Sequence, residues 1–244
     1  MRFTLIIPTL NEAASIASLF EGIEAAFRQF PTDVFFDIVV VDDGSTDDTV
    51  LILRSLNLPF PLKIIERVER GLATAVLTGF RASESEVLGV IDADLSHPPE
   101  LLPKMVETIR GHDLVIGSRH APGGAVEEWP WYRRYASMFM TALVRPLGLG
   151  VRDPLSGYFL LKRKLIDGQK LTPCGYKILL EILVKSGCRD FLEIPYTFRN
   201  RGLGKSKMGA RVTFEYLEHL LGLYFGQLRA VAAYGLTKIK ELLQ

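Results

Sequence analysis

The chain has 244 residues, of which 48% are hydrophobic, and a formal net charge of +1. This composition can bury a substantial core and therefore excludes intrinsic disorder, and the length suits one large α/β domain with or without an appendage. The two cysteines, Cys174 and Cys188, lack metal-ligand spacing. They are expected to be inert thiols in a reducing compartment. No signal peptide is expected, because strand-like sequence follows Met1 directly.

The small net charge hides a strong division along the chain. Residues 1–128 hold 10 Lys/Arg and 20 Asp/Glu, whereas residues 129–211 hold 16 Lys/Arg and 5 Asp/Glu. We interpret the first part as an acidic half that holds metal, and the second as a basic half that meets anions or a charged surface. Nucleic-acid binding is not expected, because the basic region contains no recognised reader motif.

Short apolar runs alternate with helical patterns through the first half of the chain. The alternation predicts right-handed βαβ units and a mostly parallel sheet, which binds ligands at the carboxyl ends of its strands. The expected strands are 3–7, 36–41, 62–66, 86–91 and 113–117, and the expected helices are 12–29, 46–56, 71–83 and 98–110. After a loop at 118–130, the pattern predicts a helix at 131–147, a strand at 156–161, a helix at 175–187 and a strand at 190–196.

Residues 212–243 are rich in Leu, Tyr and Phe and are expected to be helical. Charged residues interrupt this segment, so no uncharged run reaches the roughly 18–20 residues that a bilayer span requires. Two arrangements remain open, a helix in the membrane interface and a helix packed on its own domain or on a partner subunit. In the first arrangement the immersed side chains would be Leu220, Leu221, Leu223, Tyr224, Phe225 and Leu228.

The motif Asp92-Ala93-Asp94 closes an apolar run and places two carboxylates at the end of a buried strand. Such carboxylates suit a hard divalent cation, Mg²⁺ or Mn²⁺, that grips phosphate oxygens. Ser96 either completes the metal coordination or, with His97, caps the helix that starts at the following prolines. Both roles of Ser96 remain open.

Two more polar loops follow the first two strands. In the second loop, we expect Asp43 to contact the nucleotide and Asp42 to cap the helix with Ser45 or Thr46. In the first loop Asn11 looks like a helix N-cap, so Glu12 either favours the helix dipole or contacts the nucleotide. Three polar strand-end loops that converge on one crevice indicate a nucleotide site.

Basic residues in the second half supply candidate anion contacts. Arg119 follows the fifth strand, and Arg133 and Ser137 lie one helical turn apart on the same side of a helix. The stretch from Arg201 to Lys207 is a glycine-spaced basic loop that can fold over phosphates.

Together these stretches resemble the family 2 glycosyltransferases of GT-A fold, and specifically their dolichol-phosphate mannosyltransferase branch. The resemblance runs from about residue 3 to residue 210. The hallmark motifs are Val41-Asp42-Asp43-Gly44-Ser45 and Asp92-Ala93-Asp94-Leu95-Ser96-His97-Pro98-Pro99. The motifs typical of the branch are Asp153-Pro154-Leu155-Ser156-Gly157-Tyr158, Gly175-Tyr176-Lys177-Ile178-Leu179-Leu180-Glu181 and Gly204-Lys205-Ser206-Lys207.

The resemblance implies which residues bind the donor and the acceptor. The positions that match GDP-mannose contacts are Pro8, Glu12, Val41, Asp43, Asp92, Ala93, Asp94, Arg119, Arg201 and Lys207. The positions that match lipid-phosphate contacts are Arg119, Arg133, Ser137 and Arg201. Leu10 stands where many relatives carry a tyrosine against the base, which weakens the preference for guanine over uracil. The expected domain is 1–211, with a nucleotide half at 1–117, an acceptor half at 118–211 and a helical tail at 212–244.

These features predict an inverting, metal-dependent transfer of mannose from GDP-mannose to dolichyl or polyprenyl phosphate. The acceptor phosphate is already anionic near neutral pH, so its attack needs no general base. The chain resembles the short form without transmembrane hairpins, which docks at the cytoplasmic face of a membrane or relies on a membrane partner. The alternatives are transfer from UDP-glucose or another UDP-hexose, and a non-catalytic subunit that binds nucleotide-sugar at a membrane.

Overall fold

The computed structural model describes residues 1–127, 131–172, 177–199 and 216–226, without the side chains of 132–134. The strands of the main sheet are β1 Arg2–Thr9, β2 Phe35–Asp42, β3 Leu62–Glu66, β4 Val87–Val90, β5 Leu114–Ser118, β7 Phe159–Lys162 and β8 Phe191–Pro195. The α-helices with complete bounds are α1 Ile16–Phe27, α2 Thr49–Ser55, α3 Leu72–Arg81, α4 Leu102–Thr108, α5 Trp131–Ala142 and α6 Ile178–Ser186. Short 3₁₀ helices lie at Pro99–Leu101, Arg145–Leu147 and Arg163–Leu165.

The seven strands form one sheet in the order β3-β2-β1-β4-β7-β5-β8. All neighbouring pairs are parallel except those of β7, which is antiparallel to both β4 and β5. The predicted α/β class and mostly parallel sheet are therefore confirmed. Two short strands, β6 Ala125–Val126 and β9 Thr197–Phe198, pair separately, so the segment predicted as a loop at 118–130 contains a strand.

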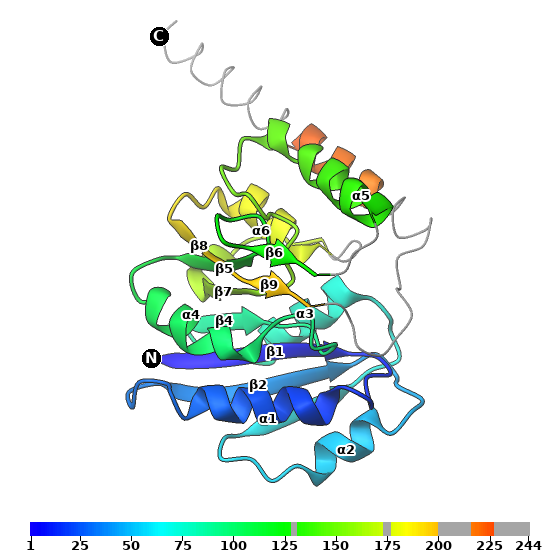
Figure 1. Cartoon of the computed structure of the whole chain (residues 1–244), viewed down its shortest axis with the longest axis vertical. Helices are drawn as coiled ribbons and strands as arrows, with labels where there is room; N and C mark the ends of the chain where they lie inside the picture. The colour runs from blue at the N-terminus through cyan, green and yellow to red at the C-terminus, as the bar shows by residue number, and fades with distance from the viewer. Residues whose placement is uncertain (128–130, 173–176, 200–215, 227–244) are drawn as a thin grey trace, which may run out of the picture.

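The core lies on both faces of the central strand β1, because alternate side chains of a strand point to opposite faces. Phe3, Leu5 and Ile7 belong to a buried cluster with α1 and α4, whereas Ile6 belongs to a cluster with α3 and α6. Figure 1 shows the parallel strands β1 and β2 with their arrowheads on the same side of the molecule. Burial on both faces explains why these strands read as continuous apolar runs.

The helices begin and end at different residues from those predicted. The first helix begins at Ile16 with Ser15 at its N-cap position, so Asn11 is not an N-cap and the prediction of helix at 12–29 is too long at its start. The second helix begins at Thr49 with Asp48 at its N-cap position rather than at 46. Polar strand-end residues, which the pattern assigned to helix starts, instead form loops between strand and helix.

The helical residues 216–226 pack side by side with α5, at the end of the molecule farthest from α2 (Figure 1). Tyr216, Leu220 and Leu223 are buried in a cluster with Met140 and other side chains of α5 and α6, and the Tyr216 hydroxyl donates to the Met140 carbonyl at 2.8 Å. Leu220 and Leu223 therefore face the protein, and their predicted immersion is wrong for these two residues. Leu221 and Phe225 are exposed, and Leu228 lies outside the described residues.

No helix within the described ranges is long and apolar enough to cross a bilayer. The proposed division into halves at residue 117 stays a prediction, and β5 from the first half lies between β7 and β8 from the second.

Gly79 of α3 provides a test of the contact between this helix and the sheet. A Cβ at Gly79 would lie 2.5 Å from Cγ2 of Ile6, a clash in a fully packed interface. We expect Gly79→Ala to lower the free energy of unfolding by about 1–3 kcal/mol, although Ala is the better helix former. Gly111→Ala is the control, because its Cβ meets only the Thr108 carbonyl oxygen at 3.9 Å. Denaturant unfolding checks both, and a Gly79→Ala protein as stable as the parent would contradict the packing argument.

Candidate active site

The polar loops after β1 and β2 are joined by hydrogen bonds at the carboxyl edge of the sheet. Oδ1 of Asn11 accepts the backbone N–H of Thr46 at 2.8 Å, and the Ser45 hydroxyl accepts the backbone N–H of Asn11 at 2.8 Å. Asn11 has a φ of 56°, a left-handed conformation that Asn tolerates better than most residues. These hydrogen bonds hold the two loops together at the carboxyl edge of the sheet, where the nucleotide crevice is predicted.

Asp42 and Asp43 are both buried, and their side chains have different partners. The predicted helix-capping role of Asp42 is wrong, because the next helix begins at Thr49 with Asp48 at its N-cap position. The nucleotide contact of Asp43 stays a prediction. Asp42 accepts the backbone N–H groups of Gly44 and Ser45, and so holds the turn after β2. Asp43 accepts from Nε of Arg67 at 2.5 Å and from the backbone N–H of Gly71 at 2.8 Å. A carboxylate has about four lone-pair positions, so Asp43 keeps acceptor capacity for a ligand.

Arg67 is a residue that the sequence reasoning missed. Besides Asp43, its guanidinium donates to the Gly71 carbonyl at 2.7 Å and to the Thr74 hydroxyl at 2.6 Å. These contacts connect the loop after β3 to the start of α3 and hold Asp43 in place. Nothing near Arg67 in the sequence marks it, because its partners are 4 to 24 residues away.

Asp94 and Ser96 form a tight turn after β4. The Ser96 hydroxyl and backbone N–H both donate to Oδ1 of Asp94, at 2.5 Å and 3.1 Å. Between them, Leu95 has a φ of 62°, an uncommon conformation for Leu and a sign of local strain of the kind that gathers at functional sites. The helix that follows has Pro98 at its N-cap position and no side-chain cap, so Ser96 and His97 do not cap it.

His97 orients Asp92. Its Nε2 lies 3.0 Å from Oδ2 of Asp92, and its Nδ1 lies 2.7 Å from the Tyr196 hydroxyl. Because the carboxylate of Asp92 only accepts, we assign a proton to Nε2 of His97, and Nδ1 shares the second hydrogen bond with the Tyr196 hydroxyl. Burial raises the pKa of Tyr196 well above its ordinary value, so that its hydroxyl keeps its proton.

The segment from Asp153 to Tyr158 packs directly against the acidic motif Asp92-Ala93-Asp94. A Cβ at Gly157 would lie 2.8 Å from Oδ2 of Asp92, so glycine is needed for this approach. The Ser156 hydroxyl donates to the Gly117 carbonyl at 2.7 Å, and the Tyr158 hydroxyl donates to the Pro98 carbonyl at 3.1 Å. The segment from Asp153 to Tyr158 therefore packs against Asp92 and holds it in position.

Arg119 is held by Asp153 in a two-pronged ion pair. Nε and Nη2 of Arg119 donate to the two carboxylate oxygens at 2.8 Å and 2.7 Å, and the Arg119 backbone N–H donates at 2.9 Å. Burial alone would lower the pKa of Arg119, but attraction from Asp153 and hydrogen bonds to it outweigh burial and raise that pKa. Burial likewise would raise the pKa of Asp153, and Arg119 overcomes this and lowers it. Both groups therefore stay charged.

The fixed guanidinium lies close to the acidic motif. Its Cζ is 5.6 Å from the ring centre of Phe198, and that ring is 5.6 Å from the ring of His97, the partner of Asp92. Nη1 of Arg119 forms none of the bonds to Asp153 and can point to an anion. Attraction from Asp92 also raises the pKa of Arg119, so this cation and the carboxylate of Asp92 lie near one another.

The remaining predicted donor contacts are placed as follows. Pro8, Val41 and Ala93 have buried side chains, so only their main chain could meet a nucleotide. Glu12 lies three residues before the N-cap of α1, so its alternative role in the first helical turn is wrong. Its carbonyl accepts the backbone N–H groups of Ser15 and Ile16. Leu10 is half-buried in the same loop.

Ser137 lies on α5, half-buried, and Arg133 is on the same helix without a described side chain. Arg201 and Lys207 lie outside the described residues, so their predicted contacts stay predictions.

The described carboxylates fit a hard cation in chemistry but do not complete a coordination shell. No group of three or more His, Cys, Asp or Glu in the described ranges gathers to hold a metal ion. Asp92 and Asp94 would supply oxygen ligands, and water and diphosphate oxygens would supply the rest, as Mg²⁺ prefers.

Solved structures with a similar fold are glycosyltransferases. A glucosyl-3-phosphoglycerate synthase from Mycobacterium tuberculosis, in complex with Mn²⁺, UDP and phosphoglyceric acid, superposes with a TM-score of 0.65 at 20% identity. It covers 92% of this chain and 78% of its own. At this identity the likeness shows the fold alone, which is GT-A.

Other proteins match this chain at higher sequence identity than this solved structure does. A dolichol-phosphate mannosyltransferase of Pyrococcus furiosus is 38% identical over 100% of this chain and 70% of its own length. A dolichol-phosphate mannosyltransferase of Saccharomyces cerevisiae is 36% identical over 92% of this chain and 87% of its own length. A polyprenol monophosphomannose synthase of Mycolicibacterium smegmatis is 35% identical over 85% of this chain and 81% of its own length. Residues 4–168 match the family described as Glycosyl transferase family 2. With the acidic strand-end loops and the GT-A sheet in place, the chain belongs to glycosyl transferase family 2 and is a glycosyltransferase.

Proposed function

We propose that this protein transfers mannose from GDP-mannose to dolichyl or polyprenyl phosphate. The observation that supports the proposal is that Asp92 and Arg119 lie near one another, and that both, with Asp94, lie near Tyr196 at the carboxyl edge of the sheet. Relatives that are 35–38% identical are named as mannosyltransferases or mannose synthases of such lipid phosphates, which supports the choice of sugar and acceptor.

The donor diphosphate would lie between the acidic motif and Arg119. Mg²⁺ or Mn²⁺, held by Asp92 and Asp94, would neutralise charge on the departing GDP. Ser96 holds Asp94 by its hydroxyl, so it supports the metal ligand rather than standing free to coordinate. The loop of Asn11 and Asp43 would bind the nucleoside, with Arg67 holding Asp43.

The acceptor phosphate would attack the anomeric carbon directly and so invert its configuration. It is an anion at neutral pH, and the crevice needs cations to reduce its repulsion from the diphosphate. Arg119, Arg133, Ser137 and Arg201 are the proposed acceptor contacts. Arg119 is already oriented for this role, because Asp153 fixes two of its three guanidinium nitrogens.

A lipid acceptor requires contact with a membrane, and we propose docking at its cytoplasmic face, directly or through a partner subunit. The exposed side of α5 supports this with Trp131, Tyr135, Met138 and Phe139, and Leu221 and Phe225 extend it on the neighbouring helix. Aromatic side chains of this kind favour the membrane interface.

A transfer assay tests the proposal. The purified protein, with Mg²⁺ or Mn²⁺, labelled GDP-mannose and dolichyl phosphate, should give a labelled product that extracts into organic solvent. UDP-glucose serves as the competing donor, because Leu10 lies at the position where relatives carry a tyrosine. Organic-soluble label from UDP-glucose alone would replace GDP-mannose as the donor, and no label from either donor would reject lipid-phosphate glycosylation.

Asp94 is the sharpest test of metal-assisted departure. Asp94→Asn keeps the shape of the turn but removes the charge, and we expect turnover to fall by at least about 100-fold, as when one electrostatic stabiliser is lost. Asp48→Asn, at an exposed position before α2, should leave turnover unchanged. Full turnover of Asp94→Asn at saturating metal would exclude Asp94 as a metal ligand.

A substitution of Arg133 distinguishes binding of the acceptor from binding of the donor. Arg133→Ala should raise KM for the lipid phosphate by about tenfold or more while donor binding changes little, because one charge-assisted contact is lost. Arg134→Ala, next to it on α5 but about 100° around the helix, is the matched control. If Arg133→Ala weakened only GDP-mannose binding, the assignment of Arg133 to the acceptor would be wrong.

A further inference from the structure

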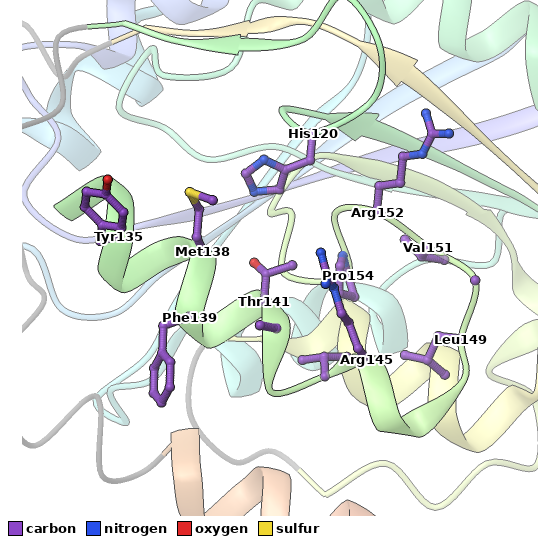
Figure 2. Close-up of a pocket in the computed structure, with 13 residues that line it drawn as sticks. His120, Tyr135, Met138, Phe139, Thr141, Arg145, Leu149, Val151, Arg152 and Pro154 are labelled. Carbon is purple, nitrogen blue, oxygen red and sulfur yellow. The ribbon is translucent and has the colours of Figure 1, made fainter. Parts of the chain in front are cut away.

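A cavity of about 870 Å³ lies between α5 and the segment 149–154, outside the crevice described above. Its volume falls within the range of small-molecule sites. Much of its lining is apolar, with Tyr135, Met138 and Phe139 from α5 and Leu149 and Val151 from the facing segment. Figure 2 shows these side chains around the space between the helix and the loop. An apolar chain is therefore the part of a ligand that the cavity fits best.

Two arginines give the cavity a cationic rim. Arg145 and Arg152 both line it, Arg145 from the 3₁₀ helix Arg145–Leu147 that follows α5 and Arg152 from the facing segment, with the Arg152 side chain extending away from Arg145 in Figure 2. Among the residues that the structure describes, neither guanidinium forms an ion pair with a carboxylate. Two unpaired guanidinium groups beside an apolar lining fit a phosphate on an apolar chain.

His120 lines the inner side of the cavity. Its Nε2 is buried and has no hydrogen-bond partner among the described residues. Buried polar atoms almost always have a partner, so this nitrogen is an unsatisfied position behind the cavity surface. Burial lowers the pKa of His120, so the ring is neutral at physiological pH and can donate or accept one hydrogen bond.

The mouth of the cavity continues into the exposed apolar surface of α5. Tyr135, Met138 and Phe139 are more than half exposed and also line the cavity. A lipid could therefore enter from the bilayer on which α5 is proposed to dock, without its chain crossing water. This continuity makes a membrane lipid the occupant that the surroundings favour.

The end of the cavity at Arg145 is separate from the proposed position of the acceptor phosphate. His120 and Pro154 line it, whereas their neighbours Arg119 and Asp153 form the ion pair of the crevice. Arg145 follows Ser137 by eight residues and Arg133 by twelve, most of them in α5. At about 1.5 Å per helical residue, roughly 12–18 Å separate Arg145 from these two residues along the helix.

We propose that this cavity binds a phospholipid of the membrane, with an acyl chain between α5 and residues 149–154 and the phosphate on Arg145 and Arg152. The bound lipid would orient α5, and with it Arg133 and Ser137, toward the acceptor. The orienting role rests on the proposed lipid acceptor, whereas the binding itself does not.

Titration calorimetry on the full chain, without donor or acceptor, tests the binding. Dihexanoyl phosphatidic acid, below its micelle concentration, should bind at least about tenfold more tightly than dihexanoyl phosphatidylcholine, whose choline offsets the phosphate charge. The double variant Arg145→Gln, Arg152→Gln should remove this preference. Arg81→Gln, an exposed arginine at the end of α3, is the matched control and should keep it.

Ala142→Trp is the second variant, because Ala142 lines the cavity on an exposed side of α5 and a large side chain there fills the space. It should abolish binding of both lipids while the circular dichroism spectrum stays unchanged.

Several results would overturn the proposal. They are no binding of either lipid, equal binding of both, or binding of phosphatidic acid that the double variant leaves intact. Farnesyl phosphate that displaces phosphatidic acid, together with a higher KM for the lipid acceptor in Ala142→Trp, would show that the cavity holds the acceptor chain instead. Phosphatidic acid binding in a protein that transfers no sugar would leave this site standing and reject only the proposed function.

Discussion

The buried ion pair of Arg119 and Asp153 is the constraint on which the candidate site depends. Two buried charges are costly unless they are matched in geometry, and removing one partner of such a pair typically costs about 3–5 kcal/mol. Here three hydrogen bonds join the two residues, including one from the Arg119 main chain. The pair therefore fixes the end of β5 relative to the segment that leads into β7. Asp153 is in turn anchored from below, because its backbone N–H donates to Glu193 next to β5 in the sheet.

From this anchor the chain runs directly to the acidic motif. Within five residues of Asp153, Ser156 binds the main chain of Gly117, Gly157 makes room for Asp92, and Tyr158 binds the main chain beside His97. The same short segment thus sets the position of the cation and of one carboxylate. Such coupling preorganises the crevice, so that a diphosphate would meet charges that need not move. The strained turn at Leu95 fits this picture, because its surroundings must hold it in place.

The sequence allowed the sheet and the acidic loops to be predicted, because both depend on local pattern. Apolar runs mark the strands, and Asp92 and Asp94 directly follow one of them. Asp43 and Arg119 also lie at strand ends, where the topology brings them to one edge. Contacts between residues far apart in sequence could not be read in this way. Arg67, His97 and Tyr196 all belong to the site, yet His97 and Tyr196 are 99 residues apart and each looks like an ordinary loop or strand residue.

The excess of Lys and Arg in residues 129–211 does not measure how many cations are available to bind an anion. Several cations of the basic half are used inside the fold rather than for ligands. Arg163 donates to three backbone carbonyls beside β4, Lys177 to the Leu155 carbonyl, and Lys185 to the buried Glu181. Each cation used in this way satisfies acceptors that the loops leave unpaired, and it is no longer available to an external anion. Of the described cations near α5, Arg145 and Arg152 are not used in this way. Which cations can meet a phosphate therefore depends on how the fold uses each of them: Arg119 is paired with Asp153 but keeps Nη1 free of that pair, and Arg145 and Arg152 have no described ion-pair partner. Net charge cannot express this property of the tertiary structure.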